Sequence, residues 1–324
     1  MFSGAESPVR SLGSLTVAPV GLGCMPLTMS YGASHRRHAG SVIGRALDLG
    51  VTHFDTSDMY GSGANERVVG AALGSDRRNV TLATKTGIRA IAGIPYGVTG
   101  SPKYIRRAVE RSLRRLRTDW IDLYYLHRVD PQVPIEESIG AMGELIRAGL
   151  IREVGVSEVD GDQLRRAHAV HPLAAVQMEW SLFERDLERD LLPAARDLGV
   201  AVTAYAPLGR GMLTSTVSNP ARLGAFDIRR TLPRWRRASL PRHLSAATEI
   251  SHIAHTFGTS SGQLALAWLL AQGDDVVPIP GTTNPIHVEQ NVRAAQLRID
   301  TATLQRVADI AAAADQGVAN PYPR

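Results

Sequence analysis

The chain has 324 residues and a mass of 34.9 kDa, and 44% of its residues are hydrophobic, which is enough to bury a large core. Barrels of alternating strands and helices commonly form one unit at this length, so we predict a single domain over residues 1–324. The chain has no apolar run of about 18 residues and no basic start followed by an apolar stretch, so we expect no membrane association and a cytoplasmic location. One cysteine, Cys24, cannot form an internal disulfide.

Arginine supplies nearly all of the positive charge. Of the 36 basic residues only Lys85 and Lys103 are lysine, which leaves 34 (36 − 2) arginines, and the formal net charge is +5. Several arginines fall in one helical stretch between apolar residues, which is typical of a solvated helix face: Arg106, Arg107, Arg111, Arg114, Arg115 and Arg117. No aromatic stacking platform accompanies them, so we predict no nucleic-acid partner, whereas a small anionic ligand is compatible with the charge.

Short apolar runs and helical patterns alternate along the chain. Strands are expected at 21–23, 51–54, 80–84, 121–126, 152–157, 174–179, 200–206 and 275–280. Helices are expected at 38–49, 65–73, 103–117, 135–148, 160–170 and 187–198. About eight strand–helix units is the number that closes a parallel barrel, so we predict the α/β class and a (β/α)8 TIM barrel.

Several segments between these elements have residues typical of helix ends or loops. Gly50, Gly149 and Gly199 each follow an amphipathic stretch and precede an expected strand by no more than three residues, which predicts a helix stop at each. The segment 209–243 is rich in Arg, Pro and Gly and lacks periodicity, so we expect a long functional loop there. A last helical pattern at 301–314 is expected to pack outside the barrel.

Four polar residues stand where expected strands end or in the turn that follows: Asp55, Tyr60, Lys85 and His127. Active sites of parallel barrels lie at this end of the strands, so residues 30 (85 − 55) and 42 (127 − 85) positions apart are expected to converge on one pocket. A tyrosine hydroxyl is a weak acid unless a nearby cation stabilises its phenolate, and Lys85 can supply that charge. Asp55 can keep the lysine protonated, and His127 can donate a hydrogen bond to a substrate oxygen. The quartet therefore predicts protonation of a carbonyl oxygen.

Reduction of a carbonyl also requires a hydride, which no side chain supplies, so a cofactor is expected. No GxGxxG motif opens an early strand–helix unit, which argues against a Rossmann domain and places a nicotinamide cofactor across the barrel mouth. We predict no metal site. A glycosidase with Asp55 and Glu179 as its two carboxylates is a competing enzyme class, but Lys85 would keep Asp55 ionised and unsuited to acid catalysis.

Several motifs together resemble the aldo-keto reductase superfamily, and in particular its bacterial NADPH-dependent subgroup. They are DTSDMYGSGANE, LATKTG, IDLYYLHRVD, VGVSE, QMEWSLFERD, AYAPLGRGML and IPGTTNPIHVEQNV, in the order of the family and over nearly the whole chain. The resemblance implies a barrel that reduces aldehydes or ketones with NADPH, and it places Asp55, Tyr60, Lys85 and His127 at the family's catalytic positions.

The resemblance also implies a set of cofactor-binding residues. Ser157 and Gln177 match positions that hold the nicotinamide carboxamide, and Tyr205 matches the ring that stacks on the nicotinamide. The pyrophosphate loop corresponds to Pro207, Leu208, Gly209, Arg210 and Gly211, and the adenosine end to Gly281, Thr282, Asn284, His287, Gln290 and Asn291.

Departures from the family pattern fall at both ends of this set. Glu158 stands where many relatives have asparagine. Asn284 and His287 stand where many have a lysine or arginine for the adenosine 2′-phosphate, and Gln290 replaces a glutamate. The resemblance to the subgroup makes NADPH or NADP+ the expected cofactor, and these departures leave NADH open.

The substrate is expected to be a small molecule with a carbonyl group. Its pocket is predicted to include Met25, Tyr31, Met59, Arg128, Trp180 and Trp235. Three alternatives stay open: an NAD(P)+-dependent sugar or alcohol dehydrogenase, a reductase for a nucleotide-linked sugar, and a redox-sensing or scaffolding subunit that binds the nucleotide but turns over slowly. The arginine-rich segment 229–242 favours the hypothesis of a nucleotide-sugar reductase, although a solvated loop explains the arginines more simply.

Overall fold

Eight parallel strands form the centre of the molecule. The computed structural model describes residues 8–29, 38–91, 93–214, 223–224 and 227–318. The strands lie in the order of the chain: β3 (Leu22–Gly23), β4 (His53–Asp55), β5 (Thr81–Thr86), β8 (Ile121–Leu126), β9 (Ile151–Ser157), β10 (Ala175–Glu179), β11 (Ala201–Tyr205) and β12 (Val276–Pro278). Each strand pairs in parallel with its neighbours.

The first and last strands meet and close the sheet. Gly23 forms a parallel bridge with Gly281, and its amide donates to the Pro280 carbonyl oxygen at 3.3 Å. The Gly21 amide donates to the Pro278 carbonyl oxygen at 2.9 Å. These contacts join β3 to β12, so the predicted (β/α)8 barrel is confirmed.

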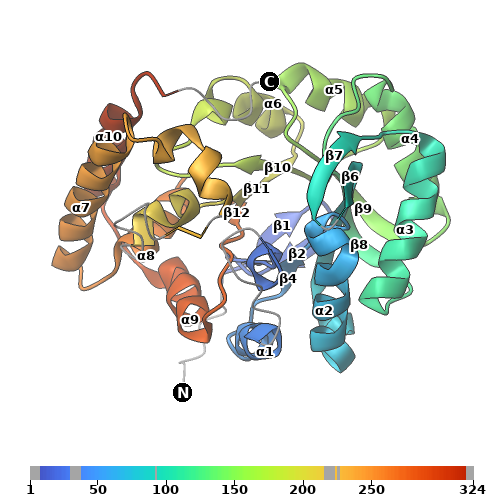
Figure 1. Ribbon diagram of the computed structural model, residues 1–324, viewed down its shortest axis with the longest axis horizontal. Helices are drawn as coiled ribbons and strands as arrows, with labels where there is room; N and C mark the ends of the chain where they lie inside the picture. The colour runs from blue at the N-terminus through green and yellow to red at the C-terminus, as the bar shows by residue number, and fades with distance from the viewer. Residues whose placement is uncertain (1–7, 30–37, 92, 215–222, 225–226, 319–324) are drawn as a thin grey trace.

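Helices surround the strands as an outer ring (Figure 1). They are α1 (Ala39–Asp48), α2 (Ala64–Leu73), α3 (Pro102–Leu116), α4 (Ile135–Arg147), α5 (Gly161–Val170), α6 (Leu191–Asp197), α7 (Leu240–Thr256), α8 (Ser261–Leu270), α9 (Pro285–Arg293) and α10 (Thr301–Asp315). Their apolar faces are buried, as in α3, where Ile105, Val109 and Leu116 point into the core. Gly50, Gly149 and Gly199, predicted as helix stops, have positive φ angles of 78°, 71° and 67°.

Two antiparallel hairpins were not expected from the sequence. The first, β1 (Arg10–Leu12) with β2 (Leu15–Val17), packs Leu12 and Val17 against residues of the barrel interior, including Ala175 at the start of β10, and so covers the N-terminal end of the barrel. The second, β6 (Ile88–Ile91) with β7 (Ile94–Val98), follows β5 at the opposite end.

The segment 209–243, expected to be a long loop, is partly helical. It contains the 3-10 helices η6 (Gly209–Thr214), η8 (Ile228–Thr231) and η9 (Pro233–Trp235), and α7 begins within it at Leu240. The helix expected at 187–198 is divided into the 3-10 helix η5 (Asp186–Arg189) and α6. No helix in the described ranges is both long and apolar enough to cross a membrane.

Candidate functional site

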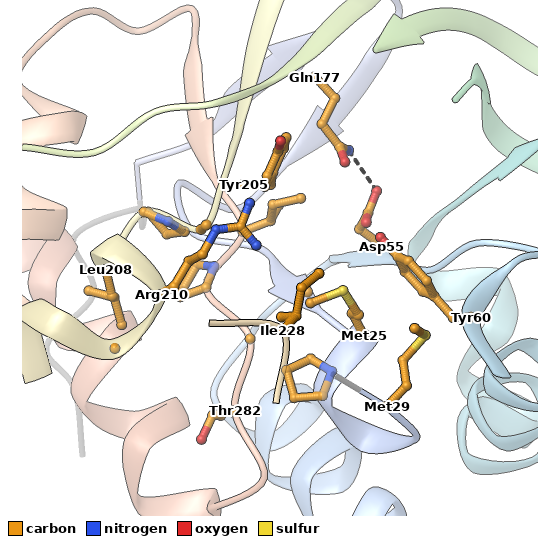
Figure 2. Close-up of a pocket in the computed structure, with 18 of the residues that line it drawn as sticks. Met25, Met29, Asp55, Tyr60, Gln177, Tyr205, Leu208, Arg210, Ile228 and Thr282 are labelled. Carbon is orange, nitrogen blue, oxygen red and sulfur yellow. Dashed lines mark hydrogen bonds between the residues drawn. The ribbon is translucent and has the colours of Figure 1, made fainter. Parts of the chain in front are cut away.

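A cavity of about 850 Å³ opens at the C-terminal ends of the barrel strands. Residues at or just after the ends of β3, β4, β8, β9, β11 and β12 line it, together with Gln177 of β10, the second hairpin and η8. Figure 2 shows Asp55 and Tyr60 on one side of the cavity and Leu208 and Arg210 on the other. The barrel therefore brings segments far apart in sequence to one concave site, which is where parallel barrels place their chemistry.

Three of the four predicted catalytic residues form one cluster. Asp55 and Lys85 stand on the adjacent strands β4 and β5, and the Lys85 ammonium contacts the Asp55 carboxylate directly. The same ammonium donates to the Thr56 carbonyl oxygen at 2.8 Å and lies 3.5 Å from the Tyr60 hydroxyl oxygen. Tyr60 lines the cavity, whereas Lys85 is fully buried behind it.

The charges of this cluster decide which proton can move. Burial acts to lower the pKa of Lys85, but Asp55 and Tyr60 outweigh it and raise that pKa, so the ammonium stays charged. Burial raises the pKa of Tyr60, and the Lys85 cation opposes this shift without reversing it. Lys85 therefore lowers the pKa of Tyr60 as expected, but burial has the larger effect and the net shift of that pKa is upward. The phenol keeps its proton, and the cation beside it favours the phenolate once that proton leaves.

His127 reaches the cavity beside Tyr60. Its ring is perpendicular to the tyrosine ring, with 6.1 Å between the two centroids. Burial, and then the cations Lys85 and Arg128, lower the pKa of His127 well below its ordinary range, so the ring is neutral. The Ser57 hydroxyl lies 3.1 Å from Nδ1 of His127 and accepts from the Met59 amide at 3.2 Å. Since the serine oxygen already accepts one hydrogen bond, we assign its hydroxyl as the donor to Nδ1. Nδ1 then carries no proton, and the ring hydrogen is on Nε2, which is free to donate.

Ser157 and Gln177 line the cavity near this cluster. The Gln177 amide nitrogen donates to Oδ2 of Asp55 at 2.8 Å, the contact drawn as a dashed line in Figure 2. Asp55 thus contacts the Lys85 ammonium through one oxygen and Gln177 through the other. Gln177 keeps its amide oxygen for a further partner, which is compatible with an amide group in the cavity.

The loop after β11 forms the opposite wall. Tyr205, Pro207, Leu208, Arg210 and Gly211 line the cavity, whereas Gly209 does not. The Arg210 guanidinium forms a buried ion pair with Glu179, at 2.5 Å between Nη2 and Oε2, and lies over the Tyr205 ring at 5.8 Å. A second cation, Arg229 from η8, also lines the cavity and donates to the Arg210 carbonyl oxygen at 3.3 Å.

The segment after β12 forms the remaining end of the cavity. Gly281, Thr282, His287, Gln290 and Asn291 line it. Nδ1 of His287 lies 3.2 Å from the Thr282 hydroxyl. Asn284 does not line the cavity; its side chain accepts from the Ile286 amide at 3.0 Å and caps α9. The prediction that Asn284 faces a cofactor is therefore not met.

Comparison with known proteins gives the cavity a family context. The model of the aldo/keto reductase family matches residues 19–312. The chain belongs to the aldo/keto reductase family. This confirms the resemblance that the sequence motifs indicated, and it makes the chain an oxidoreductase.

Three relatives of the aldo/keto reductase family illustrate the likeness. The aldo-keto reductase yakc [NADP(+)] of Schizosaccharomyces pombe is 40% identical over 306 residues, which cover 93% of this chain and 90% of that protein. A glycerol dehydrogenase from Gluconobacter oxydans has a TM-score of 0.87 at 29% identity, covering 99% of this chain and 100% of that chain. An aldo-keto reductase from Klebsiella pneumoniae, solved in complex with NADPH, has a TM-score of 0.75 at 29% identity, covering 94% and 95%.

Within this aldo/keto reductase, the predicted substrate residues divide into three groups. Met25, Met59 and Arg128 line the cavity. Tyr31 lies outside the described residues. Trp180 and Trp235 do not line the cavity, so those two predictions are wrong.

Both tryptophans are buried behind other residues. Trp180 is 0% exposed, packs edge to face on Trp268 and donates to Glu188 at 3.0 Å. Trp235 lies under the Arg229 guanidinium at 5.2 Å.

Sequence reasoning missed several other residues of the site. Ser57 orients His127 but follows Asp55 and Thr56 in an ordinary turn sequence, so only the fold reveals its role. The second hairpin contributes apolar side chains, and η8 contributes Ile228 and Arg229. The lining also includes Met29 and the hairpin residues Ile88, Pro95 and Val98.

Proposed function

We propose that this protein reduces an aldehyde or ketone to an alcohol with NADPH, and that Tyr60 donates the proton to the carbonyl oxygen. The observation that carries the proposal is the position of the Lys85 ammonium, 3.5 Å from a phenol oxygen at the wall of a large cavity. A buried lysine held in its charged form stabilises the phenolate that remains after proton donation.

The cavity suits a dinucleotide in the order of its chemical groups. Ser157 and the amide oxygen of Gln177 offer hydrogen bonds near Tyr60, and the Tyr205 ring offers an aromatic face. Arg210 and Arg229 bring guanidinium N–H groups to the middle, where a pyrophosphate would lie, and each also pairs with a carboxylate, Glu179 and Asp227 respectively. Gly211 there has a φ of 94° that favours glycine. Thr282, Gln290 and Asn291 offer polar groups at the far end. NADPH supplies a hydride when bound.

The side chains of this chain would then orient the carbonyl and move one proton. The neutral His127 donates its Nε2–H to the substrate oxygen and holds it toward Tyr60. Tyr60 gives up its hydroxyl proton as negative charge develops on that oxygen. The ammonium of Lys85 stabilises the phenolate, and Asp55 keeps the ammonium charged. Apolar residues around the cavity, including Met29 and Ile88, limit access of water.

Absorbance of the reduced nicotinamide gives a direct test. The purified protein, supplied with NADPH and a panel of small aliphatic and aromatic aldehydes, is expected to consume NADPH with at least one of them and to form the matching alcohol in equal amount. Tight binding of NADPH with no turnover on any aldehyde would contradict the proposal and favour a nucleotide-binding subunit.

Oxidation of an alcohol is a second candidate function, because the Gluconobacter oxydans protein with a similar structure (TM-score 0.87) is a glycerol dehydrogenase. The same residues would act in reverse, with the Tyr60 phenolate accepting the alcohol proton. Measuring kcat/KM in both directions, with aldehydes and NADPH and with glycerol and NADP+ or NAD+, distinguishes the two candidates.

A further inference from the structure

Residues of α2 and of α3 with its C-cap residue line a second groove. The two helices are neighbours in the outer ring of the barrel (Figure 1). The groove has a volume of about 430 Å³ and is lined by five side chains, all of them arginine: Arg67, Arg111, Arg114, Arg115 and Arg117. None of the five lines the large cavity at the barrel mouth. The groove is therefore a separate feature, and its lining has a single chemistry.

A close contact between the two helices brings these arginines together. A Cβ atom added to Gly70 of α2 would lie only 2.3 Å from the Leu116 carbonyl oxygen, so the helices touch through their backbones at this point. Arg67 lies three residues before Gly70, and Arg114 and Arg117 lie on either side of Leu116. Glycine at position 70 thus holds a positive charge of α2 beside those of α3.

Few negative groups balance this charge. Arg115 donates to Glu66 at 2.5 Å and to Ser112 at 3.2 Å. The Arg111 guanidinium lies over the Tyr104 ring at 5.3 Å. Within the described part of the chain, no hydrogen bond or ion pair joins the other three arginines to a partner. Glu66 pairs with Arg115, and Asp58, whose pKa burial raises to about 7, interacts with Arg115 and Arg111, so the net charge of the groove is +4 (5 − 1) with Asp58 protonated and +3 (5 − 2) with Asp58 ionised.

We propose that this groove binds a small anion that carries two or more linked phosphate groups. Guanidinium groups hold phosphate through paired hydrogen bonds, and the three without a partner among the described residues, Arg67, Arg114 and Arg117, come from both sides of the groove, so they can contact more than one phosphate group. The lining contains no aromatic or apolar side chain, so a nucleobase would find no surface to stack on, and the phosphate chain is the recognised part. The volume falls within the range of about 300 to 1,000 Å³ that is usual for small-ligand sites. This inference does not depend on the proposed reaction.

Calorimetric titration with inorganic triphosphate, free of divalent metal, tests the proposal on protein saturated with NADP+, so that the large cavity is filled. We expect saturable binding of one triphosphate per chain at about 50 mM salt, weakened severalfold at about 200 mM. Arg114→Glu with Arg117→Glu should weaken binding at least tenfold. Arg147→Glu with Arg165→Glu, an equal change of charge on exposed arginines of α4 and α5, should not. Arg67→Gln, on α2, should weaken binding severalfold. It replaces Arg114→Glu with Arg117→Glu as the test if that double variant does not fold.

The outcomes separate the proposal from ordinary surface charge. Absence of saturable binding, or equal binding by the groove and control variants, would overturn it. A parallel titration with ATP identifies the source of the phosphates: ATP binding within about threefold of triphosphate indicates a nucleotide tail, and no ATP binding indicates a free oligophosphate. Binding of ATP without binding of triphosphate would contradict recognition through phosphate.

Discussion

Asp58 makes the stability of this protein depend on pH, and Asp58→Asn should remove that dependence. Asp58 lies in the turn that carries Tyr60. Its Oδ2 accepts from the Thr86 hydroxyl at 3.2 Å, whereas its Oδ1 is buried without a hydrogen-bond partner in the described structure. Burial, and then the nearby Glu66 carboxylate, raise the pKa of Asp58 to about 7. The folded protein therefore favours the neutral acid, whose shape and charge asparagine reproduces.

The sign and size of the effect follow from proton linkage. An unfolded aspartate has a pKa of 3.8, so between pH 3.8 and about 7 the folded state binds more protons than the unfolded state. The contribution of Asp58 to the free energy of unfolding is therefore fully present below pH 3.8, and it is lost as pH rises through about 7. From about pH 5 upward the loss covers about two pH units at about 1.4 kcal/mol each, or on the order of 3 kcal/mol.

Urea denaturation at about pH 5 and about pH 8.5 measures this loss. The natural protein should lose on the order of 3 kcal/mol more than Asp58→Asn between the two pH values, because the asparagine cannot ionise. Asp76→Asn, at an exposed position, is the control and should follow the natural protein. Equal pH dependence in the natural protein and Asp58→Asn would refute the reasoning.

Two further substitutions test the contacts that hold the site in place. Lys85→Met should cost about 3–5 kcal/mol because it leaves the buried Asp55 carboxylate without its cation, and adding Asp55→Asn should recover much of that loss in urea denaturation. No recovery in the double variant would contradict the ion-pair argument. Gly70→Ala should destabilise by about 1–3 kcal/mol, since its Cβ would clash with Leu116, whereas Gly40→Ala, with no atom within 4 Å, should be neutral or slightly stabilising. Equal melting temperatures for the two alanine variants would contradict the predicted clash between position 70 and Leu116.

Much of the barrel could be predicted because its strands are buried on both faces. Every residue of β5 and β8 is buried, and β8 reads as a nearly continuous apolar run, whereas β5 is marked by its threonines, which favour a strand. The hairpin of β6 and β7 was missed because its residues are mostly half-buried or exposed, including Ile91 and Ile94, so no burial pattern marks it. The three-residue strands β1 and β2 are too short to show a period.

The prediction of the site residues is correct for side chains whose direction is set by their position in a strand. Asp55, Lys85 and His127 stand at or directly after strand ends, and the parallel register alone brings them together. Trp180 fails because a residue beyond a strand end can turn back into the helical layer, which depends on long-range packing against Trp268. The net rise in the Tyr60 pKa was also missed, because it depends on how deeply the phenol is buried.

Single-turnover reduction by Tyr60→Phe tests the central claim most directly. The variant and the natural protein are each saturated with NADPH and mixed with one aldehyde that the natural protein reduces, and loss of nicotinamide absorbance is followed by stopped flow. Because phenylalanine keeps the ring but lacks the proton, the rate should fall by about a hundredfold to ten-thousandfold while the Kd for NADPH changes less than about threefold. An unchanged single-turnover rate would contradict the assignment of Tyr60 as proton donor.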